Sequence, residues 1–372
     1  MDILIGILRA ILFVVIAYAV VFVAALVNIL YERRFMAFIG DRLGPNRTGP
    51  QGVLQSIADA FKMMGKEDFR PLLADPVLFT LAPVLVMIGA VSIQLVLPYT
   101  QGLAATQLNV GVIFLVAITS FTTLSILMGG WASRNKYSLV GALRAAAQMI
   151  SYEIPMLLAL LIVAMIVGSL RVGTIVAFQA HYEWIGFYSP FTFLIFYIAS
   201  IAELNRGPFD LPESESELVA GYATEYSGMR FGMFYLNEYA GLTIMSMVAV
   251  TLFFGGWMGP WSSALTWLGV SWIGILWFLV KTYILVSMLV WIRFSIPRLQ
   301  VDQLMGFAWK VLIPLGLANI LITAAIILWV PSWKWGLAIF SWIAFFAFVG
   351  LLDPILKWKL RRQRERQPVV SA

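Results

Sequence analysis

The sequence contains no cysteine and a single histidine, His181, among its 372 residues. Without cysteine the chain cannot hold an iron–sulfur cluster through thiolates, form a disulfide or use a cysteine nucleophile. One histidine also excludes haem with two histidine ligands and metal sites built from histidine clusters. We therefore expect no catalytic residue, no metal site and no covalently bound cofactor in this chain, and we interpret His181 as incidental. Any electrons must come from a partner or a diffusible molecule.

Charged residues are scarce as well, at 12% of the chain, whereas 61% of the residues are hydrophobic. The mean hydropathy of +0.89 and the recurring apolar runs, each long enough to cross a hydrocarbon core of about 30 Å, are typical of a polytopic membrane protein. The first run follows Met1 and Asp2 without a small-residue cleavage site behind it, so we expect a retained helix rather than a signal peptide.

The predicted fold is an all-α transmembrane bundle that forms a single membrane domain, residues 1–372. Nine apolar spans are expected, at about 3–31, 76–97, 109–130, 152–169, 190–204, 239–256, 272–292, 311–330 and 336–352. Twenty-one of the 25 lysine and arginine residues fall on one predicted side of these spans, three fall on the other, and Lys281 lies inside a span. Because basic residues gather on the cytoplasmic side, the N-terminus is predicted outside and the C-terminus inside. The predicted cytoplasmic segments are 32–75, 131–150, 205–238 and 293–310, followed by a basic tail at 353–372.

The first cytoplasmic segment has more features than a simple loop. Its GPNRTGPQG stretch is rich in turn-forming residues. Residues 53–66 then carry apolar side chains at helical spacing, which predicts a short amphipathic helix along the membrane surface or against a partner. A positively charged loop that only orients the protein is the alternative. That alternative does not explain why acidic residues are interleaved with the basic ones.

Acidic residues gather in a second segment, which contains FDLPESESEL at 209–218. Asp210 and Glu213 have the spacing of a helix capping box, so helix initiation alone is one explanation. Capping needs one or two acids, however, and the surrounding set is larger. In helical geometry Asp210, Glu213 and Glu217 lie on one face. The carboxylates that we expect to converge are Glu153, Glu203, Asp210, Glu213, Glu215, Glu217, Glu225 and Glu238.

Three ionisable residues lie at the edge of apolar spans or within them: Glu153, Glu203 and Lys281. A charge at bilayer depth costs at least about 2.5–3.5 kcal/mol, so such groups usually face a polar cavity and pair with one another. Snorkelling to the interface is an alternative for the two glutamates but a poor one for Lys281. Glu153 or Glu203 could be the counterion of Lys281. Carboxylates clustered at low dielectric can retain protons near neutral pH, which is the chemistry of a proton relay or a redox-coupled charge switch.

These stretches resemble the H-subunit family of bacterial NADH:quinone oxidoreductase, respiratory complex I. The matching stretches are ERR at 32–34, LGPNRTGPQGVLQSIADAFKMMGKED at 43–68, AQMISYEIP at 147–155, AELNRGPFDLPESESELVAGYATEY at 202–226 and PRLQVDQLM at 297–305. They cover nearly the whole chain in the order of the family. One departure is Gln300, where the family commonly has a second arginine before the DQLM element, so no role is carried over to that position.

The resemblance implies that quinone is the substrate and that the chain helps to form a chamber admitting it from the bilayer. It implies a multi-pass protein of the bacterial inner membrane that holds no redox centre. The implied partners are peripheral-arm subunits on the cytoplasmic side, small membrane subunits and antiporter-like subunits to the side, and no nucleic acid. The implied quinone-chamber positions are Arg33, Arg42, Asp59, Phe231, Arg293 and Arg298. The implied proton path comprises Glu153, Glu203, Asp210, Glu213, Glu217 and Glu225, to which we add Lys281.

Three other functions compete with this interpretation. A homologous subunit of a membrane-bound hydrogenase, or of a complex with another electron donor, would share these motifs without binding quinone. A stand-alone ion or solute transporter would explain Lys281 and the acids inside the spans, but it predicts inverted repeats, and none is visible in the sequence. A structural scaffold gives no reason for acids to crowd the membrane edge.

The acidic segment yields a direct test. Glu213→Gln or Glu217→Gln should weaken quinone turnover that is coupled to proton pumping, because each change removes a titratable group from the expected path. NADH oxidation with an artificial acceptor should stay intact in both variants, since that reaction bypasses the membrane subunit. Full coupled activity in both variants would contradict the hypothesis.

Overall fold

The computed structural model describes residues 2–100, 103, 106–210, 219–261, 266–267, 270–330 and 333–366. The helices in these ranges are α1 (Asp2–Ile39), η1 (Pro50–Gly52), α2 (Gln55–Gly65), α3 (Pro76–Val96), α4 (Gly111–Ala132), α5 (Lys136–Val167), α6 (Val172–Tyr182), α7 (Ile185–Tyr188), α8 (Pro190–Glu203), η2 (Gly221–Ala223), α10 (Gly228–Phe253), α11 (Trp272–Ser295), α12 (Val301–Phe307), η3 (Ala308–Leu312), α13 (Ile313–Trp329) and α14 (Trp333–Arg366). Two short antiparallel strands, β1 (Thr266–Trp267) and β2 (Val270–Ser271), form one ladder with Thr266 opposite Ser271. Among the described residues this ladder is the only sheet and every other element is a helix, so the all-α prediction is confirmed.

Eight helical stretches in the described ranges are long and apolar enough to cross a membrane, and the 14-residue helix α8 is a shorter apolar one. The eight are Ile11–Ile39, Pro76–Val96, Gly111–Ala132, Lys136–Val167, Gly228–Phe253, Trp272–Ser295, Val301–Trp329 and Trp333–Gly350. Each of these eight stretches, and α8 as the ninth, overlaps one of the nine predicted spans. The predicted amphipathic helix at 53–66 is confirmed as α2.

Two helices begin well before the predicted spans. Helix α5 starts at Lys136 rather than near 152, and α10 starts at Gly228 rather than near 239. Charged residues in the early turns, such as Arg144 and Glu238, lower the hydropathy without interrupting the helix. Asn135 caps α5 by accepting a hydrogen bond from the backbone N–H of Tyr137 at 2.9 Å. Hydropathy thus locates the apolar part of a helix, whereas the cap defines where it begins.

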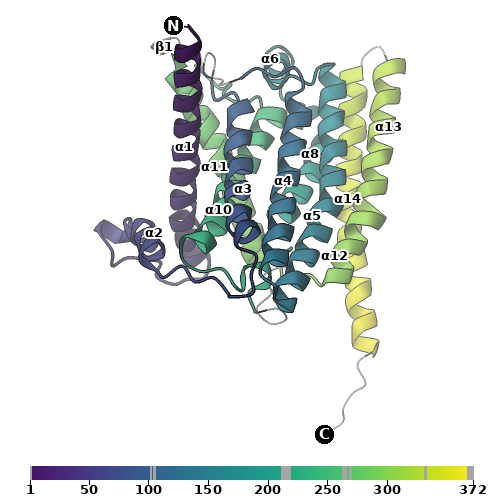
Figure 1. Ribbon diagram of the computed structural model, residues 1–372. Coiled ribbons are helices and arrows are strands. Elements are labelled where there is room, and N and C mark those ends of the chain that lie inside the picture. Colours follow the sequence, from purple (N-terminus) through teal and green to yellow (C-terminus); the bar gives the residue numbers. More distant parts are fainter. Residues whose placement is uncertain are drawn as a thin grey trace.

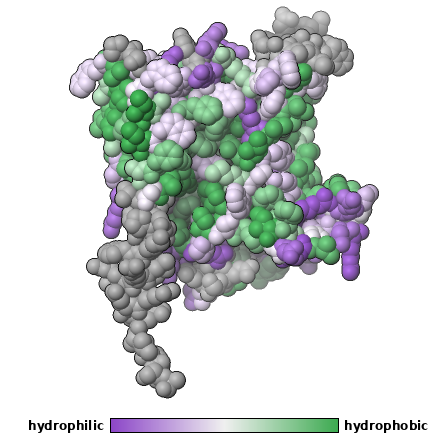
Figure 2. Space-filling model, turned by 180° about the vertical axis from the view of Figure 1, so that it is seen from behind, coloured by the Kyte–Doolittle hydropathy of each residue, from purple (hydrophilic) through white to green (hydrophobic). Residues whose placement is uncertain are grey.

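The long helices run side by side, as Figure 1 shows. The start of α1 and helix α6 lie at one end of the bundle, and α2, α12 and the far end of α14 lie at the other. The start of α1 and the far end of α14 thus lie at opposite ends of the bundle, as an odd number of membrane crossings requires. Apolar residues cover the middle of the face seen in Figure 2, and hydrophilic residues gather mainly towards the ends and around the projecting α2 region. This distribution fits a surface that faces lipid.

Helix α10 lies at the centre of the bundle and positions the site. Of its most apolar 18-residue stretch 83% is buried, compared with 11% for α14. It packs against α1, α3 and α11. Glu238, nearer the start of the helix, is also largely shielded, with 17% of its side chain exposed.

The short helix α8 is completed by its neighbours instead of by its own length. It follows the single turn of α7 and begins at Pro190, a residue suited to the first turn of a helix. The backbone N–H of Phe191 donates to Ser341 Oγ on α14 at 3.0 Å, and Asn319 on α13 donates to Thr192 Oγ1 at 2.9 Å. These contacts satisfy polar groups at the start of α8 and fix the helix that ends at Glu203.

Helix α5 approaches the segment that follows the acidic stretch at Gly141. A Cβ atom at this position would lie 2.7 Å from Gly221 Cα. Nearby, Ser138 Oγ donates to the carbonyl oxygen of Tyr222 at 2.9 Å. The absence of a side chain at Gly141 thus allows backbone contact, which anchors residues 221–226 against α5.

We predict that Gly141→Ala destabilises the protein by about 1–3 kcal/mol, because the added methyl group must push two backbone segments apart. The midpoint of thermal unfolding in detergent measures the effect. Gly65→Ala is the matched control, since a Cβ there meets nothing within 4 Å, and it should unfold like the unmodified protein. Equal stability of the two variants would show that the close approach at Gly141 has no energetic role.

Candidate functional site

A cavity of about 740 Å³ lies between α1, α2 and the start of α10. Its volume falls in the range of about 300–1,000 Å³ that is usual for small-molecule sites. Apolar side chains form much of its wall: Phe22, Leu26, Ile29, Met63, Met64, Met229, Phe231 and Leu236. Its polar side chains include Arg33, Asp59, Lys62, Lys66, Thr224 and Tyr235. We call it the α1–α2–α10 cavity.

An ion pair between α1 and α2 forms the polar part of this cavity. Arg33 Nη1 lies 2.6 Å from Asp59 Oδ2. The carboxylate is held from its other side by Gln55 Nε2, which donates to Asp59 Oδ1 at 3.0 Å, and Gln55 in turn accepts a hydrogen bond from Thr48 at 2.7 Å. The turn-rich stretch and α2 therefore orient the Asp59 carboxylate towards Arg33.

A second group of charges is buried between the cavity and the helices behind it. Arg206, just after α8, forms an ion pair with Glu238 of α10 at 2.8 Å (Arg206 Nε to Glu238 Oε1). Its Nη1 atom donates to Glu32 of α1, and Arg293 of α11 binds the other oxygen of Glu32. We call these four residues the buried ion network. It joins three spanning helices to the loop after α8.

Arg206 is almost completely buried, with 3% of its side chain exposed. Burial alone lowers the pKa of a guanidinium, because it disfavours the charged form. Here Glu238 and Glu32 outweigh that effect, so the pKa of Arg206 is raised above its ordinary value. The guanidinium also lies 4.0 Å from the centre of the Tyr239 ring, which adds a cation–π contact. Arg206 is therefore a fixed positive charge inside the protein.

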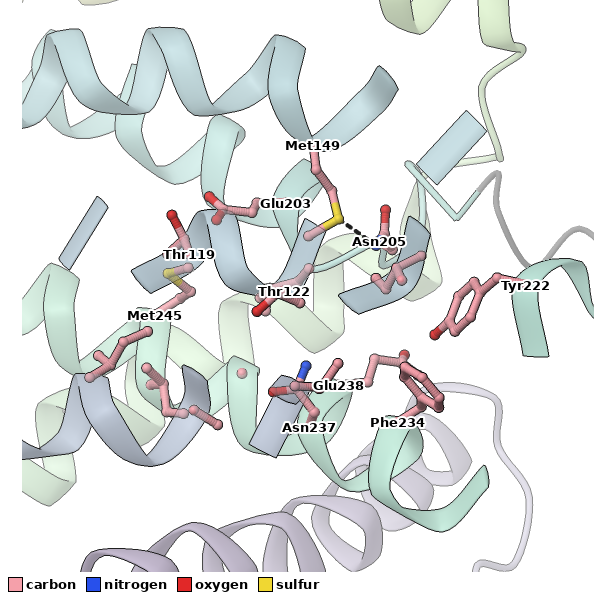
Figure 3. A pocket seen from close by; sticks show the side chains of 17 residues that line it. Thr119, Thr122, Met149, Glu203, Asn205, Tyr222, Phe234, Asn237, Glu238 and Met245 are labelled. Atoms are coloured by element: carbon pink, nitrogen blue, oxygen red, sulfur yellow. Dashed lines mark hydrogen bonds between the residues drawn. The ribbon is translucent and has the colours of Figure 1, made fainter. Parts of the chain in front are cut away.

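Glu238 also lines a smaller pocket of about 60 Å³, shared with Glu203 and with polar groups of α4 and α10. Figure 3 shows Glu203 and Glu238 on opposite sides of this pocket, with Thr119 and Thr122 of α4 nearby. This space is large enough to hold water. We call it the acidic pocket.

Glu203 has an unmet hydrogen-bonding requirement in this pocket. Within the described ranges its buried Oε2 atom has no hydrogen-bond partner. Glu153 of α5 lies within electrostatic range of Glu203 and accepts a hydrogen bond from Ser120 of α4. Buried carboxyl oxygens are normally hydrogen-bonded, so this arrangement favours water, or a proton, between the acids.

Two tyrosines lie between the cavity and the buried ion network. Tyr235 lines the α1–α2–α10 cavity and interacts with Arg33. Its hydroxyl donates to the hydroxyl of Tyr239, one turn further along α10, at 3.1 Å. Since the ring of Tyr239 lies against Arg206, polar groups connect the cavity to the network.

Comparison with known proteins identifies the family. The sequence profile of the NADH dehydrogenase family matches residues 11–324. The chain belongs to this family. Its relatives include three proteins named as the H subunit of NADH-quinone oxidoreductase. The one from Carboxydothermus hydrogenoformans is 46% identical over 307 residues, covering 82% of this chain and 85% of the relative. The one from Dehalococcoides mccartyi is 44% identical, covering 86% of this chain and 87% of the relative. The one from Geobacillus kaustophilus is 46% identical, covering 84% of this chain and 92% of the relative.

The family resemblance drawn from the motifs is thus confirmed. Of the six positions proposed for the quinone chamber, the structure brings Arg33, Asp59 and Phe231 together in the α1–α2–α10 cavity. Arg293 belongs to the buried ion network instead. Arg298 forms an ion pair with Asp210 at 3.1 Å. Arg42 follows α1 and does not line the cavity.

The positions proposed for the proton path in this NADH dehydrogenase family member separate into groups. Glu203 lines the acidic pocket, and Glu153, which does not line it, lies within electrostatic range of Glu203. Glu225 accepts a hydrogen bond from Asn135, the cap of α5, at 2.6 Å. Glu213 and Glu217, with the proposed capping box from Asp210, lie outside the described residues. Asp210 pairs with Arg298 and lies within electrostatic range of Glu238 in the buried ion network.

The expected pairing of Lys281 with Glu153 or Glu203 is corrected by the structure. The Lys281 ammonium donates to the carbonyl oxygens of Phe254 at 2.8 Å and Gly256 at 3.2 Å, and to that of Met258. It also lies 4.4 Å from the centre of the Trp184 ring. These carbonyls belong to residues that directly follow α10. Lys281 therefore holds the loop after α10, and Phe254 lies about 24 Å from Glu238 along the helix axis, at 1.5 Å per residue.

Sequence reasoning missed Arg206 and the two tyrosines. Arg206 was counted only as a topology signal, although it stands directly before the acidic stretch in NRGPFD. A lone basic residue beside a cluster of acids in an apolar chain is a signal for an internal ion pair. Tyr235 and Tyr239 are one helical turn apart, a spacing that places them on one face of α10.

Arg206→Gln should destabilise the protein by about 3–5 kcal/mol, because it leaves Glu32 and Glu238 as buried charges with less compensation. Thermal unfolding in detergent measures this loss. Arg230→Gln serves as the matched control: its partner Asp68 is 3.1 Å away and 40% exposed, so about 1 kcal/mol or less should be lost. Adding Glu238→Gln to Arg206→Gln should recover part of the stability. No recovery would show that the ion pair does not explain the loss.

Proposed function

We propose that this chain is a membrane subunit of a bacterial NADH-quinone oxidoreductase, respiratory complex I. In this proposal the α1–α2–α10 cavity receives the quinone, and the buried carboxylates couple its reduction to proton movement. The supporting observation is a continuous set of polar contacts from Arg33 through the two tyrosines and Arg206 to Glu238 and the acidic pocket. The names of the relatives provide the chemical context.

The composition of the cavity supports a ligand that is mostly apolar with a polar head. Phe22, Leu26 and Ile29 offer an apolar wall along α1, and the ion pair of Arg33 and Asp59 offers a donor and an acceptor. An isoprenoid quinone has this division: its tail packs against apolar side chains, while its carbonyl oxygens accept hydrogen bonds. Reduction to quinol requires protons as well as electrons, so a carboxylate beside the head is chemically useful.

The coupling step is electrostatic in this proposal. A change of charge or protonation at Asp59 alters the field at Arg33 and therefore at Tyr235. The tyrosine hydroxyls and Arg206 carry that change to Glu238, because a buried fixed charge is poorly screened. Glu238 and Glu203 then share a pocket in which a proton or water can exchange. The chain supplies no thiolate for an electron carrier, so the electrons come from a partner subunit.

The exposed face of α2 is a suitable contact surface for those partner subunits. Helix α2 turns Ile57 and Phe61 outward, with 44% and 68% of each residue exposed. This face lies beside the cavity, at the end of the bundle rich in lysine and arginine. We place the peripheral arm there, on the cytoplasmic side of the bacterial inner membrane. The outward apolar faces of the long helices are left for lipid, small membrane subunits and antiporter-like subunits.

Two variants separate quinone binding from proton coupling. Asp59→Asn should lower quinone turnover about tenfold, because it removes a charge-assisted contact beside the ligand head. Glu203→Gln should lower quinone reduction less than Asp59→Asn does but move fewer protons for each quinone reduced, since it removes one of the two carboxylates of the acidic pocket. Quinone reduction and proton uptake are measured on the complex in liposomes, and NADH oxidation with a hydrophilic acceptor reports intact electron entry.

Asp41→Asn is the matched control for the first variant. It removes an exposed acid of the same cytoplasmic segment that does not line the cavity, and it should behave like the unmodified complex. Unchanged quinone kinetics in Asp59→Asn would reject the cavity as the quinone site. Unchanged proton yield in Glu203→Gln would reject the acidic pocket as part of the coupling path. If the unmodified complex neither oxidised NADH nor reduced quinone, the hydrogenase-type function would be favoured instead.

A further inference from the structure

A separate cavity of about 430 Å³ lies at the opposite end of the bundle from α2. It is enclosed by the connection between α3 and α4, the first turns of α6 and the residues after α10. In Figure 1 this is the end where α6 and the start of α1 lie. Its polar side chains include Thr100, Thr106, Gln107, Arg171 and Thr174. Neither the proposed quinone site nor the buried ion network reaches it.

Arg171 gives this cavity a positive charge that the described residues do not neutralise. Its Nη2 atom donates to the neutral amide oxygen of Gln107, and none of the ion pairs within the described ranges includes it. The connection from 97 to 110 contains no acidic residue. Glu183, beyond the far end of α6, is about 18 Å away along that helix at 1.5 Å per residue.

The surroundings of Arg171 increase this excess of positive charge. Arg171 immediately precedes α6, whose first turn contains no acidic residue. The start of a helix carries a partial positive charge, so it repels the guanidinium instead of compensating it. Arg171 is also one of only three basic residues on this side of the predicted spans. Its position is therefore not explained by the general tendency of basic residues to face the cytoplasm.

The rest of the cavity fits an amphipathic anion. Val96, Leu108, Val172 and Trp257 supply apolar wall beside the hydroxyl groups. The connection before α4 and the first turn of that helix expose Val110 and Ile113, 52% and 47% accessible, on the outer surface of the bundle. A ligand with a charged head and long apolar chains could place the head at Arg171 and the chains along α4. Tryptophan is common at this depth because its ring has an apolar body and one polar N–H.

We propose that this cavity binds the phosphate group of an anionic phospholipid from the leaflet at the α6 end of the bundle. Arg171 pairs with the phosphate, and the acyl chains follow the apolar surface of α4. Guanidinium and phosphate form strong charge-assisted hydrogen bonds, often in pairs. The lipid supplies the negative charge that Arg171 lacks and joins α6 to the connection between α3 and α4.

Lipid titration of the protein in its native assembly tests this assignment. The assembly is purified in mild detergent, delipidated and titrated with phosphatidylglycerol, and bound lipid is counted by native mass spectrometry. Arg171→Gln should weaken one binding event about tenfold, the loss expected for a charge-assisted hydrogen bond. Arg171→Lys should stay within about threefold of the unmodified protein because the charge remains. Lys334→Gln, a neutralised cation at the same end but outside the cavity, should not change binding.

Each alternative has its own outcome. Phosphatidylglycerol binding that is undiminished in Arg171→Gln overturns the proposal. A loss of affinity in Arg171→Lys as large as that in Arg171→Gln also overturns it, because the positive charge would then not be what binds the lipid. Equally tight binding of zwitterionic phosphatidylcholine overturns the requirement for an anionic lipid. Inorganic phosphate that displaces the lipid at equal concentration overturns the lipid assignment and indicates a small-anion site. None of these outcomes depends on quinone turnover, so the test stands apart from the proposed function.

Discussion

The burial of Arg206 between Glu32 and Glu238 is the constraint on which the site depends. Each of these charges would be costly inside a membrane protein, and each is tolerated because the others are within contact distance. The three residues come from α1, from the loop after α8 and from α10, and Arg293 adds α11. Their mutual neutralisation therefore fixes the relative placement of segments that are far apart in the sequence. The cavity meets this network through Tyr235 and Tyr239, and Glu238 of the network lines the acidic pocket.

Helix α10 contributes residues to the cavity, to the buried ion network and to the acidic pocket. Tyr235 faces the cavity, Tyr239 lies against Arg206, and Glu238 reaches the acidic pocket. Because consecutive residues point in different directions around a helix, one central helix can line two compartments and the partition between them. Beyond the other end of the same helix, Lys281 donates to carbonyl oxygens of the loop that follows it, which is a structural role. A lysine in an apolar span is thus explained here without an acidic counterion.

The two ends of the bundle differ in their charge chemistry. At the α2 end, acids and bases are numerous and many are paired with one another, as Arg33 with Asp59 and Arg298 with Asp210 illustrate. At the α6 end charges are few, and the partner of Arg171 within the described part of the chain is a neutral amide. Internal pairing makes the α2 end suited to responding to a bound ligand. The uncompensated charge at the α6 end is suited to holding an anion from outside the chain.

The sequence by itself determined the all-α membrane fold, the order of the apolar helices, the amphipathic helix α2 and the family, because hydropathy and motif spacing are local properties of the chain. The family resemblance pointed to Arg33 and Asp59, and Glu203 stood out as a charge at the end of an apolar span. Only the tertiary structure decided which charges meet. Arg293 joins Glu32 rather than the cavity, Lys281 meets carbonyls rather than acids, and Arg206 connects α1 to α10. Which charges pair depends on how the helices pack against one another, and the paired residues can be more than a hundred positions apart in the chain. No local pattern in the sequence encodes such a contact.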